Sequence, residues 1–205
     1  MKTFSRRRAF IRALSVLPVL QTMLSAQPTN AGTNVVDGML GGHGYFYPPV
    51  LLPDFGVTDQ LGKHAQFRQV LRGRISLVQL IFTTCSNICP IQGATFSQLQ
   101  NMIPVVQRSQ VQLLSVTIDP LNDDPKALAA WLNPFAPIAM WKALQPDLND
   151  IDLVRKLLNQ NKNELNSHLS EVLLVDTSAR LVWRSTELPS SEALADKLFA
   201  LLKKR

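Results

Sequence analysis

The sequence predicts an α/β sandwich, in which a central mixed β-sheet is flanked by helices and preceded by an N-terminal β-hairpin. Three observations predict this class. Strand-like and helix-like segments alternate along the chain, a late hairpin is followed by a closing helix, and an apolar run typical of a buried strand lies near the middle. The two cysteines of the chain, Cys85 and Cys89, directly follow that apolar run.

The first predicted elements precede the cysteines. Residues 52–63 form an extended segment that turns at 60–62 into a second short strand, which gives the hairpin. The mostly apolar run 75–82 is typical of a strand covered on both faces. The helix that follows carries the cysteines, because Pro90 is tolerated in a first turn and Pro104 forces a break.

The remaining elements continue the alternation. Residues 111–118 predict the next strand, and the acidic cap and proline at 123–125 begin a helix that reaches about 133. The other predicted elements are a helix over 147–160, a hairpin with strands at 170–175 and 180–184, and a closing helix over 190–203. With a cysteine pair after the central strand, this order predicts a thioredoxin-like fold.

The amino terminus has the features of an export signal over residues 1–26, with cleavage expected between Ala26 and about residue 31. Residues 7–12 resemble the twin-arginine pattern, although Arg6 stands where that pattern has a serine. The apolar stretch is interrupted by Pro18 and is shorter than the roughly 20 residues that a membrane-spanning helix needs, which favours cleavage. An ordinary signal peptide and an uncleaved anchor are the alternatives.

Export places the protein in the periplasm, with membrane contact only through an uncleaved signal or a membrane-bound partner. Residues 27–44 contain several glycines and no periodicity, so we expect a flexible leader there. Residues 45–205 then form one domain, which is long enough to bury its own core.

The net charge of +6 belongs largely to the expected signal. Five of the 21 basic residues lie in the signal and no acidic residue precedes Asp37, which leaves 16 basic and 15 acidic residues in the remainder. A nearly neutral mature chain gives no reason to expect a nucleic-acid partner.

The cysteine pair predicts redox or metal chemistry. Cysteines four residues apart at the opening of a helix project both sulfurs from one face, about 5–6 Å apart at Cβ. Such a pair can close as a disulfide or hold a soft metal such as Cu(I). A structural disulfide is the weaker interpretation, because a 15-residue loop gains roughly 3 kcal/mol and a loop this short gains less. A helix N-terminus also lowers thiol pKa values, which favours the thiolate.

Several segments in this order resemble the Sco/SenC family, whose members are periplasmic or mitochondrial copper proteins associated with cytochrome oxidase assembly. The resemblance is carried by the opening hairpin at 54–63, the turn at 71–74, the two cysteines with Pro90, the aspartate–proline segment at 117–125, and His168. It implies that Cys85, Cys89 and His168 bind copper as Cu(I) or Cu(II). It also implies an apo copper protein as partner, such as a cytochrome oxidase subunit.

This chain departs from the family pattern beside the cysteines. It has Ser86 and Asn87 where the family often has proline and aspartate, so we expect a lower thiol pKa than in relatives that carry the aspartate. His43 and His64 are expected to be exposed loop histidines rather than copper ligands. Asp119 is expected either to position the site through a hydrogen bond or to form a turn.

Two functions remain open from the sequence. The first is a copper chaperone, which is not an enzyme and needs both cysteines and His168. The second is a thiol–disulfide reductase that keeps the cysteines of a copper acceptor reduced, with a thiol–disulfide partner and no need for His168.

Overall fold

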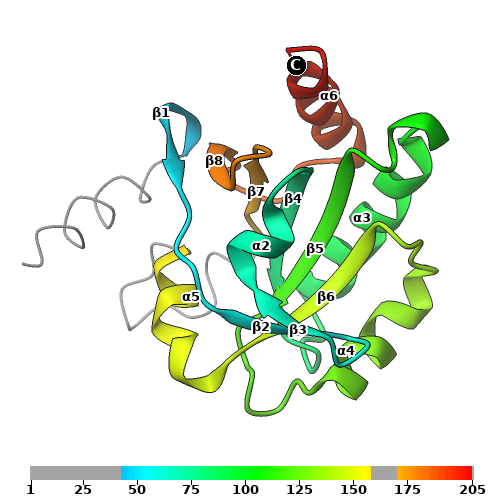
Figure 1. Cartoon of the computed structure of the whole chain (residues 1–205). Helices are drawn as coiled ribbons and strands as arrows, with labels where there is room; N and C mark the ends of the chain where they lie inside the picture. The colour runs from blue at the N-terminus through cyan, green and yellow to red at the C-terminus, as the bar shows by residue number, and fades with distance from the viewer. Residues whose placement is uncertain (1–42, 158–169, 205) are drawn as a thin grey trace, which may run out of the picture. The chain divides into compact units, whose positions relative to one another are not determined.

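A mixed β-sheet forms the centre of the computed structural model, which describes residues 43–157 and 170–204 (Figure 1). Its strand order is β1-β8-β7-β4-β5-β6-β2-β3. The strands are β1 (Gly44–Leu51), β2 (Gly56–Asp59), β3 (His64–Gln66), β4 (Ile75–Ile81), β5 (Val111–Thr117), β6 (Trp141–Pro146), β7 (Val172–Val175) and β8 (Arg180–Arg184). The helices are α2 (Phe67–Leu71), α3 (Ile88–Met102), α4 (Pro125–Leu132), α5 (Ile151–Leu157) and α6 (Ser191–Leu202), with short 3-10 turns η1 (Val105–Gln107), η2 (Asn133–Phe135) and η3 (Leu148–Asp150).

The centre of the sheet is parallel. Strand β4 pairs in parallel with β5, and β5 with β6, whereas β7 runs antiparallel to β4. Every residue of β4 and β5 is buried, as the apolar runs in the sequence predict for strands covered on both faces. The carboxyl ends of β4, β5 and β6 therefore share one end of the sheet, and their amino ends share the other.

Helices cover both faces of the sheet, so the predicted sandwich is confirmed. Apolar side chains of α3, α4 and α6 pack in one core cluster, and those of α2 and α5 pack in a second. Strand β4 contributes Leu77 and Ile81 to the first cluster and Val78 and Leu80 to the second, because successive strand side chains point to opposite faces.

Three elements were not predicted. Strand β1 precedes the hairpin and pairs with β8, so the predicted hairpin, β2 and β3, does not open the domain but forms the opposite edge of the sheet. Strand β6 lacks an apolar run because the half-buried Lys142 and Gln145 interrupt it. Helix α2 has five residues, too few for a helical period to appear.

The helix expected over 147–160 begins later. The 3-10 turn η3 precedes α5, and the last three residues of the predicted range lie outside the described residues. Within the part of the chain that the structure describes, no helix has the length and apolar character needed to cross a membrane.

Candidate functional site

The two cysteines lie at the carboxyl end of β4, but only one of them is helical. Cys85 belongs to the loop after β4, and Cys89 lies in the first turn of α3, which begins at Ile88. The expectation that both sulfurs project from one helical face is therefore wrong. Pro90 explains the helix start, because proline fits the first turn, where its missing N–H has no intrahelical partner to lose.

The N-terminus of α3 is directed at the sulfur of Cys85. The N-cap residue Asn87 makes no side-chain capping hydrogen bond. The backbone amides of Cys89, Asn87 and Ile88 instead donate hydrogen bonds to the Cys85 sulfur, as does the Cys89 thiol. Burial raises the pKa of Cys85, but these hydrogen bonds outweigh it, and the pKa lies below its ordinary value.

Cys89 is shifted in the opposite direction. Its side chain is fully buried, whereas Cys85 is half-buried. Burial, together with the hydrogen bond from its thiol to Cys85, raises the pKa of Cys89 to about 12, and the charges of Cys85 and Asp123 add to the effect. Both cysteines are free thiols, so the site pairs a readily ionised sulfur with a protonated one.

A buried carboxylate holds the loop that carries Cys85. Asp123 accepts hydrogen bonds from the backbone amide of Thr83 at 3.0 Å, from the Thr83 hydroxyl at 2.5 Å and from the Thr117 hydroxyl at 2.5 Å. Because Thr83 lies two residues before Cys85 and Thr117 ends β5, Asp123 ties the cysteine loop to the neighbouring strand. The sequence predicted Asp123 as part of an acidic helix cap, but its carboxylate is fully buried and bonds the cysteine loop instead, because a buried carboxylate must find hydrogen-bond donors.

Asp119 is a turn-former, which was one of its two expected roles. Its carboxylate accepts hydrogen bonds from the side-chain amide of Asn122 at 3.0 and 2.8 Å. Its carbonyl accepts from the backbone amides of Asn122 and Asp123. This turn brings Asp123 back to the cysteine loop, so among the described residues Asp119 acts on the site through its backbone.

The histidines expected to be exposed have carboxylate partners. Nε2 of His64 lies 3.2 Å from Asp147, with both side chains substantially exposed. Nε2 of His43 lies 2.8 Å from the buried Glu171. His168, the expected third metal ligand, lies outside the described residues. Within residues 43–157 and 170–204, no three histidine, cysteine or carboxylate side chains lie close enough together to hold one metal ion.

The sheet order, the helices on both faces and a pair of thiols at the start of α3 define a thioredoxin-like protein. The SCO1/SenC family model matches residues 47–203. The chain therefore belongs to the SCO1/SenC family, and the resemblance found in the sequence is confirmed.

Known relatives agree with this assignment. A SCO2-like protein of Rickettsia typhi is 26% identical over 139 residues, covering 62% of this chain and 66% of that protein, just under two thirds of its length. The structure of Bradyrhizobium japonicum ScoI with copper bound is 22% identical, covers 74% of this chain and 99% of ScoI, and has a TM-score of 0.61. BsSco, a Sco-family cytochrome c oxidase assembly protein with a disulfide switch, is 20% identical, covers 77% of this chain and 96% of BsSco, and has a TM-score of 0.62. At these identities the two structures establish the fold.

Proposed function

We propose that this protein is an exported copper chaperone that binds copper through Cys85, Cys89 and His168. The observation that carries the proposal is the pair of free thiols at the start of α3, one with a lowered and one with a raised pKa. Membership of the SCO1/SenC family supports it, as does the relative ScoI, whose structure has copper bound.

The two sulfurs suit copper as cargo. Thiolates are soft ligands that select Cu(I), and an imidazole adds a third donor that also accepts Cu(II). Cys85 offers a thiolate at lower pH than an ordinary cysteine, whereas Cys89 must lose a proton when it binds metal. Copper uptake therefore releases a proton, and affinity rises with pH. Structural zinc would require a fourth ligand.

The topology supports His168 as the third ligand. Strand β7 runs antiparallel to β4, with Val172 opposite Gln79 near the carboxyl end of β4. The chain therefore enters β7 at the same end of the sheet from which the cysteine loop departs. Ser170 is the first described residue on that entry, and His168 stands two positions before it in the sequence.

The acceptor that we propose is an apo copper centre in a subunit of a respiratory cytochrome oxidase. Support comes from BsSco, a relative that belongs to the cytochrome c oxidase assembly proteins. The exposed loop at 84–87 is the part of the site through which an acceptor can reach the sulfur of Cys85.

The test of copper binding compares the two redox states of the pair. Reduced protein is expected to bind one Cu(I) per chain, and protein with a Cys85–Cys89 disulfide is expected to bind none, because a disulfide offers no thiolate. Metal content and free-thiol count are measured on the same samples. Equal copper binding by the oxidised protein would overturn the proposed site.

Export is a separate part of the proposal, and the pattern at residues 7–12 supports it. Replacing both Arg7 and Arg8 with lysine is expected to leave the precursor in the cytoplasm, if the twin-arginine route is used. Cell fractionation and immunoblotting measure the outcome. Normal periplasmic accumulation of the variant would assign export to the general secretory route instead.

A second candidate function is thiol–disulfide reduction, which the opposite pKa shifts of the two cysteines favour. The Cys85 thiolate would attack a partner disulfide, forming a mixed disulfide and releasing one partner thiolate. The Cys89 sulfur, after losing its proton, would then attack Cys85, releasing the second partner thiolate. The pair would end as a Cys85–Cys89 disulfide, having given two electrons to the partner.

His168→Ala separates the two functions. An imidazole is a metal ligand but is not required for thiolate attack. A variant that loses copper delivery while it still reduces disulfides supports the chaperone. The opposite outcome has two parts: His168→Ala binds copper and supports oxidase assembly normally, and Cys85→Ser fails in both reductase and assembly assays. In that case the reductase function replaces the copper-chaperone function.

A further inference from the structure

A cationic pocket lies at the other end of the sheet from the thiols. It has a volume of about 210 Å³, and its lining includes four cations and one carboxylate: Lys63, Arg72, Arg74, Lys142 and Asp59. Arg74 directly precedes β4, whereas the cysteines follow it, and seven residues of strand span roughly 23 Å. The pocket is therefore separate from the proposed copper site.

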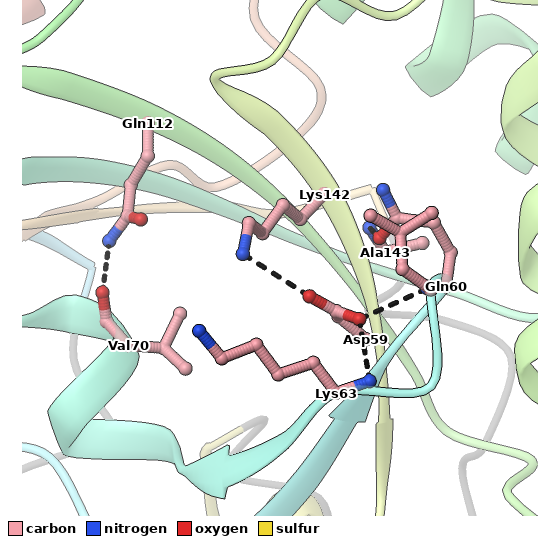
Figure 2. Close-up of polar contacts among 8 residues, drawn as sticks. Asp59, Gln60, Lys63, Val70, Gln112, Lys142 and Ala143 are labelled. Carbon is pink, nitrogen blue, oxygen red and sulfur yellow. Dashed lines mark hydrogen bonds and ion pairs between the residues drawn. The ribbon is translucent and has the colours of Figure 1, made fainter.

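The one carboxylate in the lining is already occupied. Asp59 is buried and accepts hydrogen bonds from the backbone amides of Leu61 and Lys63, each at 3.0 Å, and from the ammonium group of Lys142 at 3.2 Å. Figure 2 shows Asp59 between the side chains of Lys63 and Lys142, both of which extend toward Val70. Asp59 thus neutralises Lys142 and holds the turn that carries Lys63.

The other three cations have no carboxylate partner among the described residues. Lys63 and Arg72 are exposed and Arg74 is half-buried, and no ion pair joins any of them to an acidic side chain in that part of the chain. An uncompensated cluster of like charges in one cavity creates a positive potential that attracts anions.

The backbone around these cations is fixed before any ligand arrives. Gly73, between the two arginines, has a φ of +85°, and its amide donates to the carbonyl of Thr177 at 2.9 Å. Val70 also lines the pocket, and its carbonyl accepts a hydrogen bond from the side-chain amide of Gln112 at 2.7 Å, which anchors α2 (Figure 2). A preorganised wall lowers the cost of binding.

The size and lining of the pocket restrict its ligand. Pockets for drug-sized molecules measure about 300–1,000 Å³, so this cavity is small. Its apolar lining includes Val57, Ala65 and Leu144, and four of its six polar side chains are cationic, the other two being Asp59 and Gln69. Guanidinium groups match the oxygens of a phosphate or carboxylate in pairs, and lysine adds a point charge.

We propose that this pocket binds a compact, multiply charged phosphate group, either free in solution or as the headgroup of an anionic lipid. Such a group would compensate the charges of Lys63, Arg72 and Arg74 together, which a single carboxylate cannot do. Binding is expected to weaken as salt is added, because Lys63 and Arg72 are exposed and their charges are screened.

The experiment uses the full chain, reduced and free of metal, with inorganic pyrophosphate as the probe. Calorimetry is expected to show saturable binding, which the double variant Arg72→Gln/Arg74→Gln weakens by about tenfold or more, since it removes charge-assisted hydrogen bonds. The matched control is Lys126→Gln/Lys204→Gln, which removes two exposed positive charges outside the pocket and is expected to bind like the unmodified chain.

A second arm distinguishes the two sources of the phosphate group. Co-sedimentation with vesicles of equal parts phosphatidic acid, whose phosphomonoester can carry two negative charges, and phosphatidylcholine is compared with pure phosphatidylcholine. Arginine-dependent binding to the anionic vesicles but not to pyrophosphate assigns a lipid headgroup and still supports the pocket. The proposal is overturned if neither probe binds or if the control pair loses as much affinity. It is also overturned if polyglutamate alone binds in an arginine-dependent way, which would indicate an acidic protein partner.

Discussion

The two ends of the parallel strands each contain a buried aspartate, and the two carboxylates receive different kinds of donor. At the thiol end, Asp123 accepts hydrogen bonds from the neutral backbone amide of Thr83 and from the hydroxyls of Thr83 and Thr117. At the opposite end, Asp59 accepts from two backbone amides and from the ammonium group of Lys142.

This difference gives the two ends opposite electrostatic character. Neutral donors stabilise Asp123 without cancelling its charge, which helps to keep Cys89 protonated. Lys142 cancels the charge of Asp59, so the remaining cations of the pocket determine its sign. One end of the sheet is thereby suited to a soft cation and the other to an anion.

The largest expected effect comes from removing the carboxylate at the thiol end. Asp123→Ala leaves one amide and two hydroxyls without their acceptor, so we expect the free energy of unfolding to fall by about 3 kcal/mol. Urea unfolding followed by circular dichroism measures the change. Asp119→Ala is the matched control and should cost less than about 1 kcal/mol, because its side-chain bonds are exposed. Equal losses would contradict the role of Asp123.

Asp59→Ala is expected to cost less, about 2 kcal/mol, because water can reach the half-buried ammonium group of Lys142. The effect depends on pH. Burial raises the pKa of Asp59, but the hydrogen bonds from Lys63, Lys142 and Leu61 together hold it below its usual value. Its contribution is therefore complete above the unfolded pKa of about 4 and is lost as the pH falls through the folded pKa.

The measurement is the difference in unfolding free energy between the unmodified chain and Asp59→Ala, taken at neutral pH and in acid. The difference should shrink in acid. A difference that stays constant or grows as the pH falls would mean that the ionised carboxylate is not what stabilises this end.

The two thiols should differ in reactivity at one pH. In the folded, metal-free protein, Cys85 is expected to react with iodoacetamide with a midpoint below the ordinary thiol pKa of about 8.5. Cys89, with its pKa raised to about 12, should remain unmodified at neutral pH. Mass spectrometry of peptides from timed samples locates the label. Faster labelling of Cys89 would reverse the assigned roles.

The smallest expected effect comes from restoring a carboxylate beside the thiols. Asn87→Asp should raise the pKa of Cys85 by about half a unit to one unit, since the new negative charge opposes the thiolate but is exposed. The pH dependence of alkylation measures the shift. Asparagine and aspartate have the same shape, so the substitution leaves the backbone unchanged. A lowered pKa of Cys85 in Asn87→Asp would therefore show that the added charge does not act on this thiol.

The cysteine site was predictable because its signals are local in the sequence. Cys85, Cys89 and Pro90 lie within six residues, directly after an apolar run that could only be a buried strand or helix segment. The exact start of α3 was not predictable, because the helix period allowed Cys85 either inside or before the first turn. Because α3 begins at Ile88, Cys85 lies before the helix and accepts hydrogen bonds from its first amides, whereas Cys89 is buried in the first turn. This difference in position lowers the pKa of Cys85 and raises that of Cys89.

The cationic pocket could not be predicted, because its residues come from four separate elements. Lys63 and Lys142 meet only through the pairing of β2 with β6, and β6 itself gave no strand signal. Asp123 was similarly hidden, since a run of acidic residues before a proline is typical of a helix cap. Its neighbour Asp124 does cap α4, whereas Asp123 is turned inward to the cysteine loop.

The most direct test of the central claim is X-ray absorption spectroscopy at the copper edge of the Cu(I)-loaded protein. We predict two sulfur ligands and one nitrogen ligand in the unmodified chain, from Cys85, Cys89 and His168. His168→Ala should lose the nitrogen and keep both sulfurs, whereas the exposed-histidine control His64→Ala should match the unmodified chain. A nitrogen ligand that persists in His168→Ala, or a centre with fewer than two sulfurs, would contradict the proposed copper site.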